Sequence, residues 1–310
     1  MRSIVLFLVS VFLLGIFFFR YPLTIFQTDQ NVSKKFTIVC TTSILADTIR
    51  NIVGEHAEVL SLMGPGVDPH LYRPREGDVH RLAHADLVFY HGLHLEGKLA
   101  TILESLERYA PTYAVSDALP HELLRTVDGQ RLYDPHIWHA IPLWIRVVEQ
   151  CAAWCASHDS AHAALYHANA KVYVEQLLIL HASILEAIAS LSSDRRILVT
   201  AHDAFGYFGA TYGLEVIALQ GTSTESEIGT WDVMHLVDFI VHRKVPALFV
   251  ETAIPHRTLQ AVVDAVQFRG HKVRLGEELY ADALGDAHSG ADTYIGMLTH
   301  NRDVIVRGLQ

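Results

Sequence analysis

One uninterrupted helical pattern in the middle of the chain constrains its fold more than any other feature. Residues 157–191 contain neither proline nor glycine, and their apolar residues recur at helical spacing. At 1.5 Å per residue this stretch would span roughly 50 Å, which is longer than a typical globular helix. We therefore predict a rigid helix, assigned to 157–192, that links two lobes. Two shorter helices with an unmarked break between them are the alternative.

Short apolar runs alternate with amphipathic stretches on both sides of this helix, in two groups of four. Such alternation predicts βαβ units with parallel sheets, and so an α/β fold. Strands are expected at 36–41, 58–62, 87–90, 112–115, 197–200, 215–219, 247–250 and 272–275. Helices between them include 44–54, 78–84, 95–108, 231–243 and 257–269.

The N-terminus predicts export. Arg2 and Arg20 flank seventeen residues without a charge, which is close to the length of a membrane-spanning helix. No small-residue cleavage site follows this apolar stretch, so we favour an uncleaved signal anchor over a cleaved signal peptide for 1–20. Residues 21–35 would then form a polar tether, and the rest of the chain would lie in the periplasm, tethered to the cytoplasmic membrane.

Composition narrows the class of protein. A net charge of −10 argues against nucleic acid as a partner, and a hydrophobic fraction of 50% excludes a disordered chain. The three cysteines, Cys40, Cys151 and Cys155, are too few for a disulfide framework, and we interpret them as buried free thiols. Histidine is in excess: there are 20, and the first is His56. This excess of histidine is consistent with a metal site, but it does not indicate which residues would form one.

A short motif occurs twice in the first half, as Asp68-Pro69-His70 and Asp134-Pro135-His136. Proline restricts its own backbone and that of the preceding residue, so the imidazole that follows is held on a stiff, extended loop. The aspartate two positions earlier can hydrogen-bond locally or orient the imidazole ring. Preorganised imidazoles are what a metal site needs.

Three further positions lie at or beyond the carboxyl ends of predicted strands, where α/β sheets bind ligands. His202 follows the strand at 197–200, and Glu251 follows the strand at 247–250 and could accept an imidazole N–H. Asp282 and Asp286 follow the last strand, and either could supply a carboxylate ligand. Three imidazoles and one carboxylate suit Zn²⁺ and are tolerated by Mn²⁺, whereas Ca²⁺ and Mg²⁺ require more oxygen ligands.

Other motifs are absent or are interpreted as surface features. We find no Walker-type phosphate loop, no G-x-S-x-G turn and no H-E-x-x-H helix. The local histidine clusters His80/His84 and His91/His94 are interpreted as exposed side chains.

The chain resembles the metal-binding receptors of bacterial zinc and manganese ABC importers, and most of all the Tro-type receptors of spirochaetes. The resemblance covers about residues 36–309, with the motifs in the family's order and spacing. These motifs are MGPGVDPHLY (63–72), DPHIW (134–138), VTAHDAFGYF (199–208) and LYADALGD (279–286), with weaker support from GTS (221–223) and FVE (249–251).

The resemblance implies two lobes, 36–156 and 193–310, each with a central four-stranded parallel sheet flanked by helices. By motif position, His70, His136, His202 and Asp282 would hold one metal ion in the cleft between the lobes. The resemblance thus selects Asp282 over Asp286. It also implies delivery of the ion to a membrane permease driven by a cytoplasmic ATPase, and we expect the receptor to be a monomer.

Some residues depart from the family's pattern. The chain lacks the lipoprotein cysteine of many relatives, and His139-Ala140 stands where relatives often have an acidic or hydroxyl residue. Manganese-specialised members tend to have glutamate at the position of His202, so this ligand set leans toward zinc or mixed zinc and manganese use. A non-enzymatic receptor is the leading hypothesis. The alternatives are a metal-dependent hydrolase, with Glu251 or Asp286 as general base, and an exported adhesin stabilised by the metal.

Overall fold

The computed structural model describes residues 35–127, 132–252 and 254–310. Residues Phe36–Gln310 form one compact unit. The expected signal anchor at 1–20 and all but the last residue of the expected tether at 21–35 lie outside the described residues.

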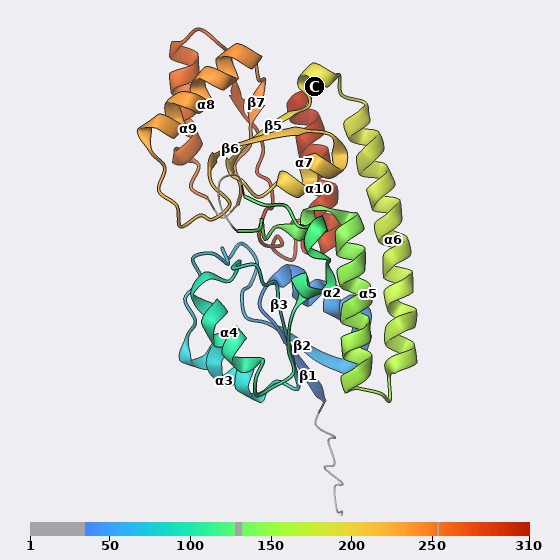
Figure 1. Ribbon diagram of the computed structural model, residues 1–310. Coiled ribbons are helices and arrows are strands. Elements are labelled where there is room, and N and C mark those ends of the chain that lie inside the picture. The colour runs from blue at the N-terminus through green and yellow to red at the C-terminus, as the bar shows by residue number, and fades with distance from the viewer. Residues whose placement is uncertain (1–34, 128–131, 253) are drawn as a thin grey trace, which may run out of the picture. The chain divides into compact units, whose positions relative to one another are not determined.

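The first lobe is built on a parallel four-stranded sheet with the strand order β2-β1-β3-β4 (Figure 1). Its strands are β1 (Phe36–Cys40), β2 (Ala57–Ser61), β3 (Leu87–Tyr90) and β4 (Thr112–Ala114). The intervening helices are α2 (Ser43–Val53), α3 (Glu76–His84) and α4 (Ala100–Leu106). Thr42 caps α2 by accepting the Leu45 N–H through its hydroxyl, so the helix begins directly after β1.

The second lobe repeats this order of strands. Parallel pairs join β5 (Ile197–His202) to β6 (Glu215–Gln220) and β7 (Ala247–Leu248) to β8 (Arg274–Leu275). A single parallel bridge between Thr200 and Phe249 connects the two pairs, with the Phe249 N–H donating to the Val199 carbonyl at 2.8 Å. The order is therefore β6-β5-β7-β8. In both lobes the connections reverse direction beside the first strand, which is where α/β sheets bind ligands.

Helices α7 (Gly206–Tyr212), α8 (Thr230–Arg243) and α9 (Arg257–Phe268) flank the second sheet, and α10 (Tyr294–Leu309) ends the chain. The long helix expected over 157–192 is shorter in the structure. It is α6 (Ala163–Ala189), and α5 (Ile141–His158) precedes it after a turn at 159–162. The Asp159 carboxylate stabilises this turn by accepting from His162 and Tyr166, at 2.8 and 2.5 Å. The break between α5 and α6 contains no proline or glycine. The Asp159 side chain stabilises it instead.

Helix α6 contacts both lobes. It packs along α5, against α2 of the first lobe and against α10 of the second (Figure 1). Among the described helices it alone is long and apolar enough to cross a membrane by length and composition. However, one stripe of α6, which includes Tyr173, Leu177 and Ile184, is buried in the protein core, as in a structural helix of a folded unit.

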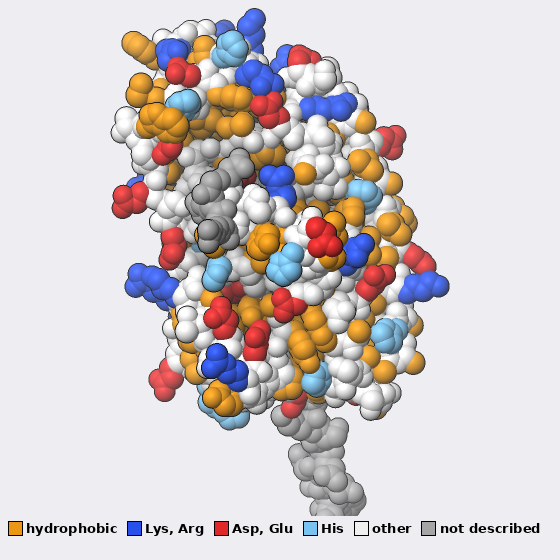
Figure 2. All heavy atoms as spheres, in the orientation of Figure 1, with side chains coloured by type: hydrophobic (Ala, Val, Ile, Leu, Met, Phe, Trp, Pro, Cys, Tyr) orange, Lys and Arg blue, Asp and Glu red, His pale blue; other side chains and the backbone are white. Residues whose placement is uncertain are grey.

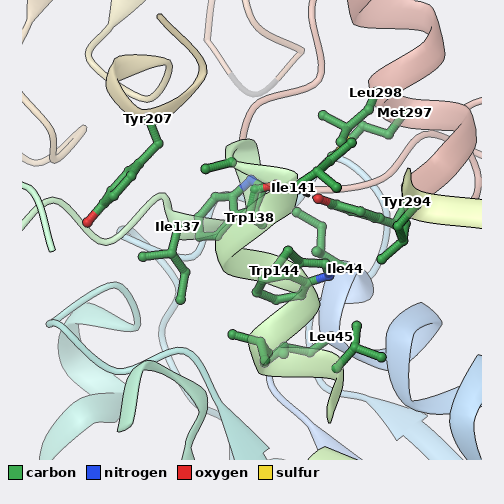
Figure 3. Close-up of a cluster of buried hydrophobic side chains, with 14 of the residues drawn as sticks. Ile44, Leu45, Ile137, Trp138, Ile141, Trp144, Tyr207, Tyr294, Met297 and Leu298 are labelled. Atoms are coloured by element: carbon green, nitrogen blue, oxygen red, sulfur yellow. Dashed lines mark hydrogen bonds between the residues drawn. The ribbon is translucent and has the colours of Figure 1, made fainter. Parts of the chain in front are cut away.

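The largest hydrophobic core runs without interruption from one lobe to the other (Figure 3). Trp138 and Trp144 lie next to Tyr294 of α10, and the rings of Trp144 and Tyr294 are 5.7 Å apart. The Trp138 indole N–H donates to the Ala281 carbonyl at 2.8 Å, and the Tyr294 hydroxyl donates to the Trp138 carbonyl at 2.6 Å. The lobes are therefore joined by a packed apolar layer as well as by α6.

All three cysteines are buried and unpaired, as the sequence predicts. Burial raises the pKa of each thiol above its ordinary value. These cysteines are therefore small apolar core residues rather than reactive groups.

Candidate metal centre

Four side chains that the sequence singles out converge in one buried cluster. His70 and His136 lie on loops of the first lobe, His202 ends β5, and Asp282 lies on the loop after β8. One nitrogen or oxygen atom from each lies within 4.8 Å of the corresponding atom of every other. Each of the four residues is at most 3% exposed. The structure thus gathers potential metal ligands from both lobes.

The separations within the cluster suit a metal ion of small radius. His70 Nε2 lies 3.3 Å from His136 Nε2, His136 Nε2 lies 3.5 Å from Asp282 Oδ1, and His202 Nε2 lies 3.2 Å from Asp282 Oδ2. Two atoms bound tetrahedrally to zinc at 2.0–2.2 Å would lie about 3.4 Å apart. The side chains therefore need little movement to coordinate one ion.

The second Asp-Pro-His turn holds its imidazole tightly. Asp134 Oδ1 accepts both the backbone N–H of His136, at 2.9 Å, and its ring Nδ1–H, at 2.8 Å. This bond fixes the tautomer and directs the Nε2 lone pair at the cluster. Asp134 Oδ2 lies 3.7 Å from Arg125 Nε, and the Tyr207 hydroxyl of α7 donates to the Asp134 carbonyl at 3.2 Å. A Cβ atom on Gly206 would come within 2.9 Å of Asp134 Oδ2, so a larger residue there would displace the Asp134 carboxylate.

The first Asp-Pro-His turn is connected differently. Asp68 Oδ1 accepts the backbone N–H of His70 at 2.8 Å. Asp68 Oδ2 accepts the hydroxyl of Thr224, which belongs to the second lobe, at 2.7 Å. Burial raises the pKa of the Asp68 carboxyl, while these two hydrogen bonds oppose the rise. The same sequence motif thus orients a ring in one copy and joins the two lobes in the other.

His202 is held from its own sheet by Glu251, which forms a parallel bridge with Leu279 beyond β7. Glu251 Oε1 accepts the backbone N–H of His202 at 3.0 Å and the ring Nδ1–H at 3.1 Å, and Oε2 accepts the Ala201 N–H at 3.1 Å. Glu251 is fully buried. Both carboxylate oxygens are therefore used to fix the end of β5 and leave Nε2 of His202 free to face the cluster.

Several donor atoms of the cluster are buried without a hydrogen-bond partner. These atoms are both carboxylate oxygens of Asp282 and Nε2 of His202, and the ion pair between His202 Nε2 and Asp282 Oδ2, 3.2 Å apart, offsets their burial only in part. Leaving such groups buried and unpartnered is costly, which is a strong reason to expect a cation among them. Burial would raise the pKa of Asp282, but the three imidazoles, His202 foremost, hold it below the usual range. The carboxylate is therefore anionic and available as a ligand.

The imidazoles respond to the same surroundings in opposite ways. Burial lowers the pKa of His70 to about 3, so its ring is neutral and able to coordinate. Burial would also lower the pKa of His202, but Asp282 and Glu251 together raise it well above its ordinary value. A metal ion would therefore displace a proton from His202 on binding.

Two more histidines lie behind the cluster. His91 was interpreted as a surface residue, but it is 1% exposed, because its ring packs against Trp138 and Trp144 with centroids 4.7 and 5.9 Å apart. His139 is fully buried, and its ring lies 4.5 Å from that of Phe205. Burial lowers the pKa of both residues to about 3. Both rings are therefore neutral wall residues next to the second turn.

The remaining candidates lie away from the cluster. Asp286 is exposed, whereas Asp282 is buried within the cluster. His80 and His84 stack on the exposed surface of α3 with their rings 4.1 Å apart, and His94 is exposed. Thr224, which contacts the first turn, carried no signal in the sequence because its partner is 156 residues away.

Comparison with known proteins places the chain in a family. The family model described as "ZnuA: Zinc-uptake complex component A periplasmic" matches residues 38–308. The manganese-binding lipoprotein MntA of Bacillus subtilis is 40% identical over 96% of this chain and 98% of its own length. The zinc-binding protein TroA of Treponema pallidum is 42% identical over 91% of each chain.

The fold agrees with that of a solved relative. The structure of the periplasmic zinc-binding protein TroA from Treponema pallidum superposes with a TM-score of 0.86, covering 89% of this chain and 99% of TroA. The match spans both lobes and the linking helices. With this agreement in sequence, length and fold, the chain belongs to the periplasmic zinc-uptake component A (ZnuA) family.

Proposed function

We propose that this chain is an extracytoplasmic receptor that captures one divalent transition-metal ion, zinc or manganese, and delivers it to an ABC importer. The observation that carries the proposal is the buried cluster of His70, His136, His202 and Asp282, with donor atoms left unpartnered at its centre. We propose these four as the ligands, supported by Asp68, Asp134 and Glu251. The family relationship supports the same function.

The types of ligand in the cluster indicate which metal ion the protein would bind more tightly. Three imidazoles and one carboxylate favour zinc over manganese by intrinsic affinity, because manganese binds such sites more weakly. The curated relatives include both a manganese-binding and a zinc-binding protein. We therefore propose that the site accepts both ions and binds zinc more tightly.

The alternative of a metal-dependent hydrolase gains no support from the site. A catalytic zinc keeps an open coordination position and a nearby general base. Glu251, one candidate base, has both oxygens engaged with Ala201 and His202. Asp286, the other, is exposed outside the cluster. We therefore propose a binding protein without enzymatic activity.

The remaining assignments extend the same proposal. A permease and a cytoplasmic ATPase would be its partners, and residues 1–20, followed by the tether 21–35, would hold a monomeric receptor at the membrane. The lobes 36–156 and 193–310 would close on the ion with little hinge motion, since α6 and the shared core join them. On the face shown in Figure 2, Lys and Arg side chains are scattered rather than gathered into one basic patch. We propose no nucleic-acid partner, because the net charge of the chain is −10.

Metal titration of residues 35–310, purified without added metal, tests the function. One equivalent of Zn²⁺ should bind and raise the melting temperature, and Mn²⁺ should do so with lower affinity. His202→Ala should lose more than the roughly 10–100-fold in zinc affinity that loss of an orienting partner costs. The matched control, His80→Ala, removes an exposed histidine on α3 and should bind as the parent does. Parent-like affinity in His202→Ala would show that the site is assigned wrongly.

A further inference from the structure

We propose that Thr224 is a positioning residue that clasps the lobes together and sets the rate at which the metal ion leaves. This inference rests on the proposed function and adds a residue that lies outside the ligand set. Thr224 lies on the segment between β6 and α8, in the second lobe. Its hydroxyl donates to Asp68 Oδ2 of the first lobe at 2.7 Å. We call this hydrogen bond the clasp.

In the first lobe, the clasp is connected through Asp68 to His70, one of the proposed metal ligands. Asp68 uses its other oxygen to hold the backbone N–H of His70, at 2.8 Å. The carboxylate therefore connects the Thr224 hydroxyl directly to the peptide that carries an imidazole of the cluster. Because a carboxylate is charged, both hydrogen bonds are of the stronger kind.

On the second-lobe side, the clasp also leads to a ligand. Gln220, the last residue of β6, donates its side-chain amide to the Thr224 carbonyl at 2.9 Å and also to the Ser226 carbonyl. Gln220 is the register partner of His202 at the end of β5. A continuous path of hydrogen bonds and sheet pairing thus runs from His202 through Thr224 to His70 without passing through the metal position.

The clasp differs from the hydrogen bonds that lie in the buried layer between the lobes. The Trp138–Ala281 and Tyr294–Asp47 hydrogen bonds belong to the buried layer, since all four residues are buried. Thr224 and Asp68 are only partly buried, and the neighbouring Glu225 is exposed. A solvent-accessible clasp can open while the buried layer stays intact. Its opening would free one oxygen of Asp68 from the second lobe, and the His70 peptide would then be held by a less constrained carboxylate.

Thr224→Val is the direct test, because it removes the hydroxyl and keeps the shape of the side chain. The full chain is purified in detergent and loaded with Zn²⁺, and the rate of zinc loss to excess chelator is measured by stopped flow. We expect loss to become about tenfold faster, the order of one hydrogen bond to a charged group, with the association rate unchanged. Thr224→Ser keeps the hydroxyl and should restore the parent rate to within about twofold.

Two further variants separate the clasp from a general effect on the loop. Glu225→Gln alters the exposed neighbour, whose carboxylate lies 4.0 Å from Lys98 Nζ, and should leave the rate of zinc loss unchanged. In an Asp68→Ala background, Thr224→Val should add nothing, since its partner is already absent.

Each outcome bears on the proposal. A parent-like rate in Thr224→Val, equally fast loss in Thr224→Ser or Glu225→Gln, or additive effects of Asp68→Ala and Thr224→Val would overturn the clasp while leaving the receptor function intact. Failure of the parent protein to bind either metal would instead overturn the proposed function, and the clasp with it.

Discussion

The two Asp-Pro-His turns carry the same three residues, yet their carboxylates serve different groups. In both turns the aspartate accepts the backbone N–H of the histidine, at 2.8 Å in the first and 2.9 Å in the second. Asp134 then also accepts the ring Nδ1–H of His136 at 2.8 Å. Asp68 instead accepts the Thr224 hydroxyl of the opposite lobe at 2.7 Å.

The surroundings of the turns explain this difference. Asp134 is 3% exposed, and the His136 ring lies 5.2 Å from that of Trp138, whereas Asp68 is only partly buried and Leu71 beyond it is 51% exposed. The local sequence sets the backbone of each turn in the same way. Tertiary partners decide whether the carboxylate aims a ring or joins two lobes.

The largest expected difference concerns metal affinity. Asp134→Ala should weaken zinc binding by roughly 10–100-fold, because it removes the acceptor that fixes the tautomer and basicity of His136. Asp68→Ala should weaken binding less and act mainly through faster zinc loss, since it removes a backbone contact and the clasp. Asp286→Ala is the control, because that acid is exposed outside the cluster. Chelator competition measures all three, and an equal or larger loss in Asp68→Ala would contradict this distinction.

The second expected effect is a pH dependence of the free energy of unfolding. It arises at His91, whose ring packs on Trp138 beside the second turn. Burial lowers the pKa of His91 to about 3, whereas an imidazole in the unfolded chain has its ordinary value near 6.5. Below that value the unfolded chain takes up a proton that the folded protein excludes. This contribution to stability is therefore fully present above about pH 6.5 and is lost as pH falls toward 3, at about 1.4 kcal/mol per pH unit.

His91→Gln isolates this effect. Glutamine can replace the 2.8 Å hydrogen bond between His91 Nε2 and the Thr42 hydroxyl, but it does not titrate. Between pH 7 and pH 5 the metal-free parent should lose about 2 kcal/mol more unfolding free energy than the variant, as measured by urea denaturation at each pH. Identical pH dependence in both proteins would show that the buried ring takes up a proton in the folded state.

The sequence predicts most of the architecture, because the apolar strands and amphipathic helices carry their own local patterns. It does not predict the turn at 159–162, since the stabilising bonds come from the Asp159 side chain rather than from proline or glycine. The residues alone left Asp282 and Asp286 equivalent, and only family resemblance separated them. The structure then buries Asp282 and exposes Asp286.

Contacts between distant segments account for what the sequence could not supply. The burial of His91 depends on Trp138 and Trp144, which join it only through tertiary packing. The role of Thr224 depends on Asp68, which lies in the opposite lobe. A hydrophobic pattern in the sequence indicates the period of a strand or helix. It does not predict which side chains will contact each other across a cleft.

The smallest expected difference compares two hydroxyls that cross between the lobes. Tyr207 of α7 donates to the Asp134 carbonyl at 3.2 Å and accepts the Arg125 N–H at 2.9 Å. It thus holds the backbone of the second turn, whereas Thr224 holds the carboxylate of the first. Tyr207→Phe should lower the free energy of unfolding by about 2 kcal/mol, because it removes two hydrogen bonds with a usual net value of about 1 kcal/mol each. The rate of zinc loss should change by less than about twofold, since Asp134 still orients His136.

Thermal or urea denaturation and the stopped-flow assay together check this prediction. Thr224→Val is its counterpart: it should accelerate zinc loss with little change in the stability of the metal-free protein, because Thr224 is only partly buried and water can replace its hydrogen bond. Fast zinc loss in Tyr207→Phe would mean that the rate of zinc release depends on the position of the second turn, and not on the orientation of the His136 ring. The two turns would then be equivalent despite their different partners, because any contact that crosses the cleft would hold the ion equally well.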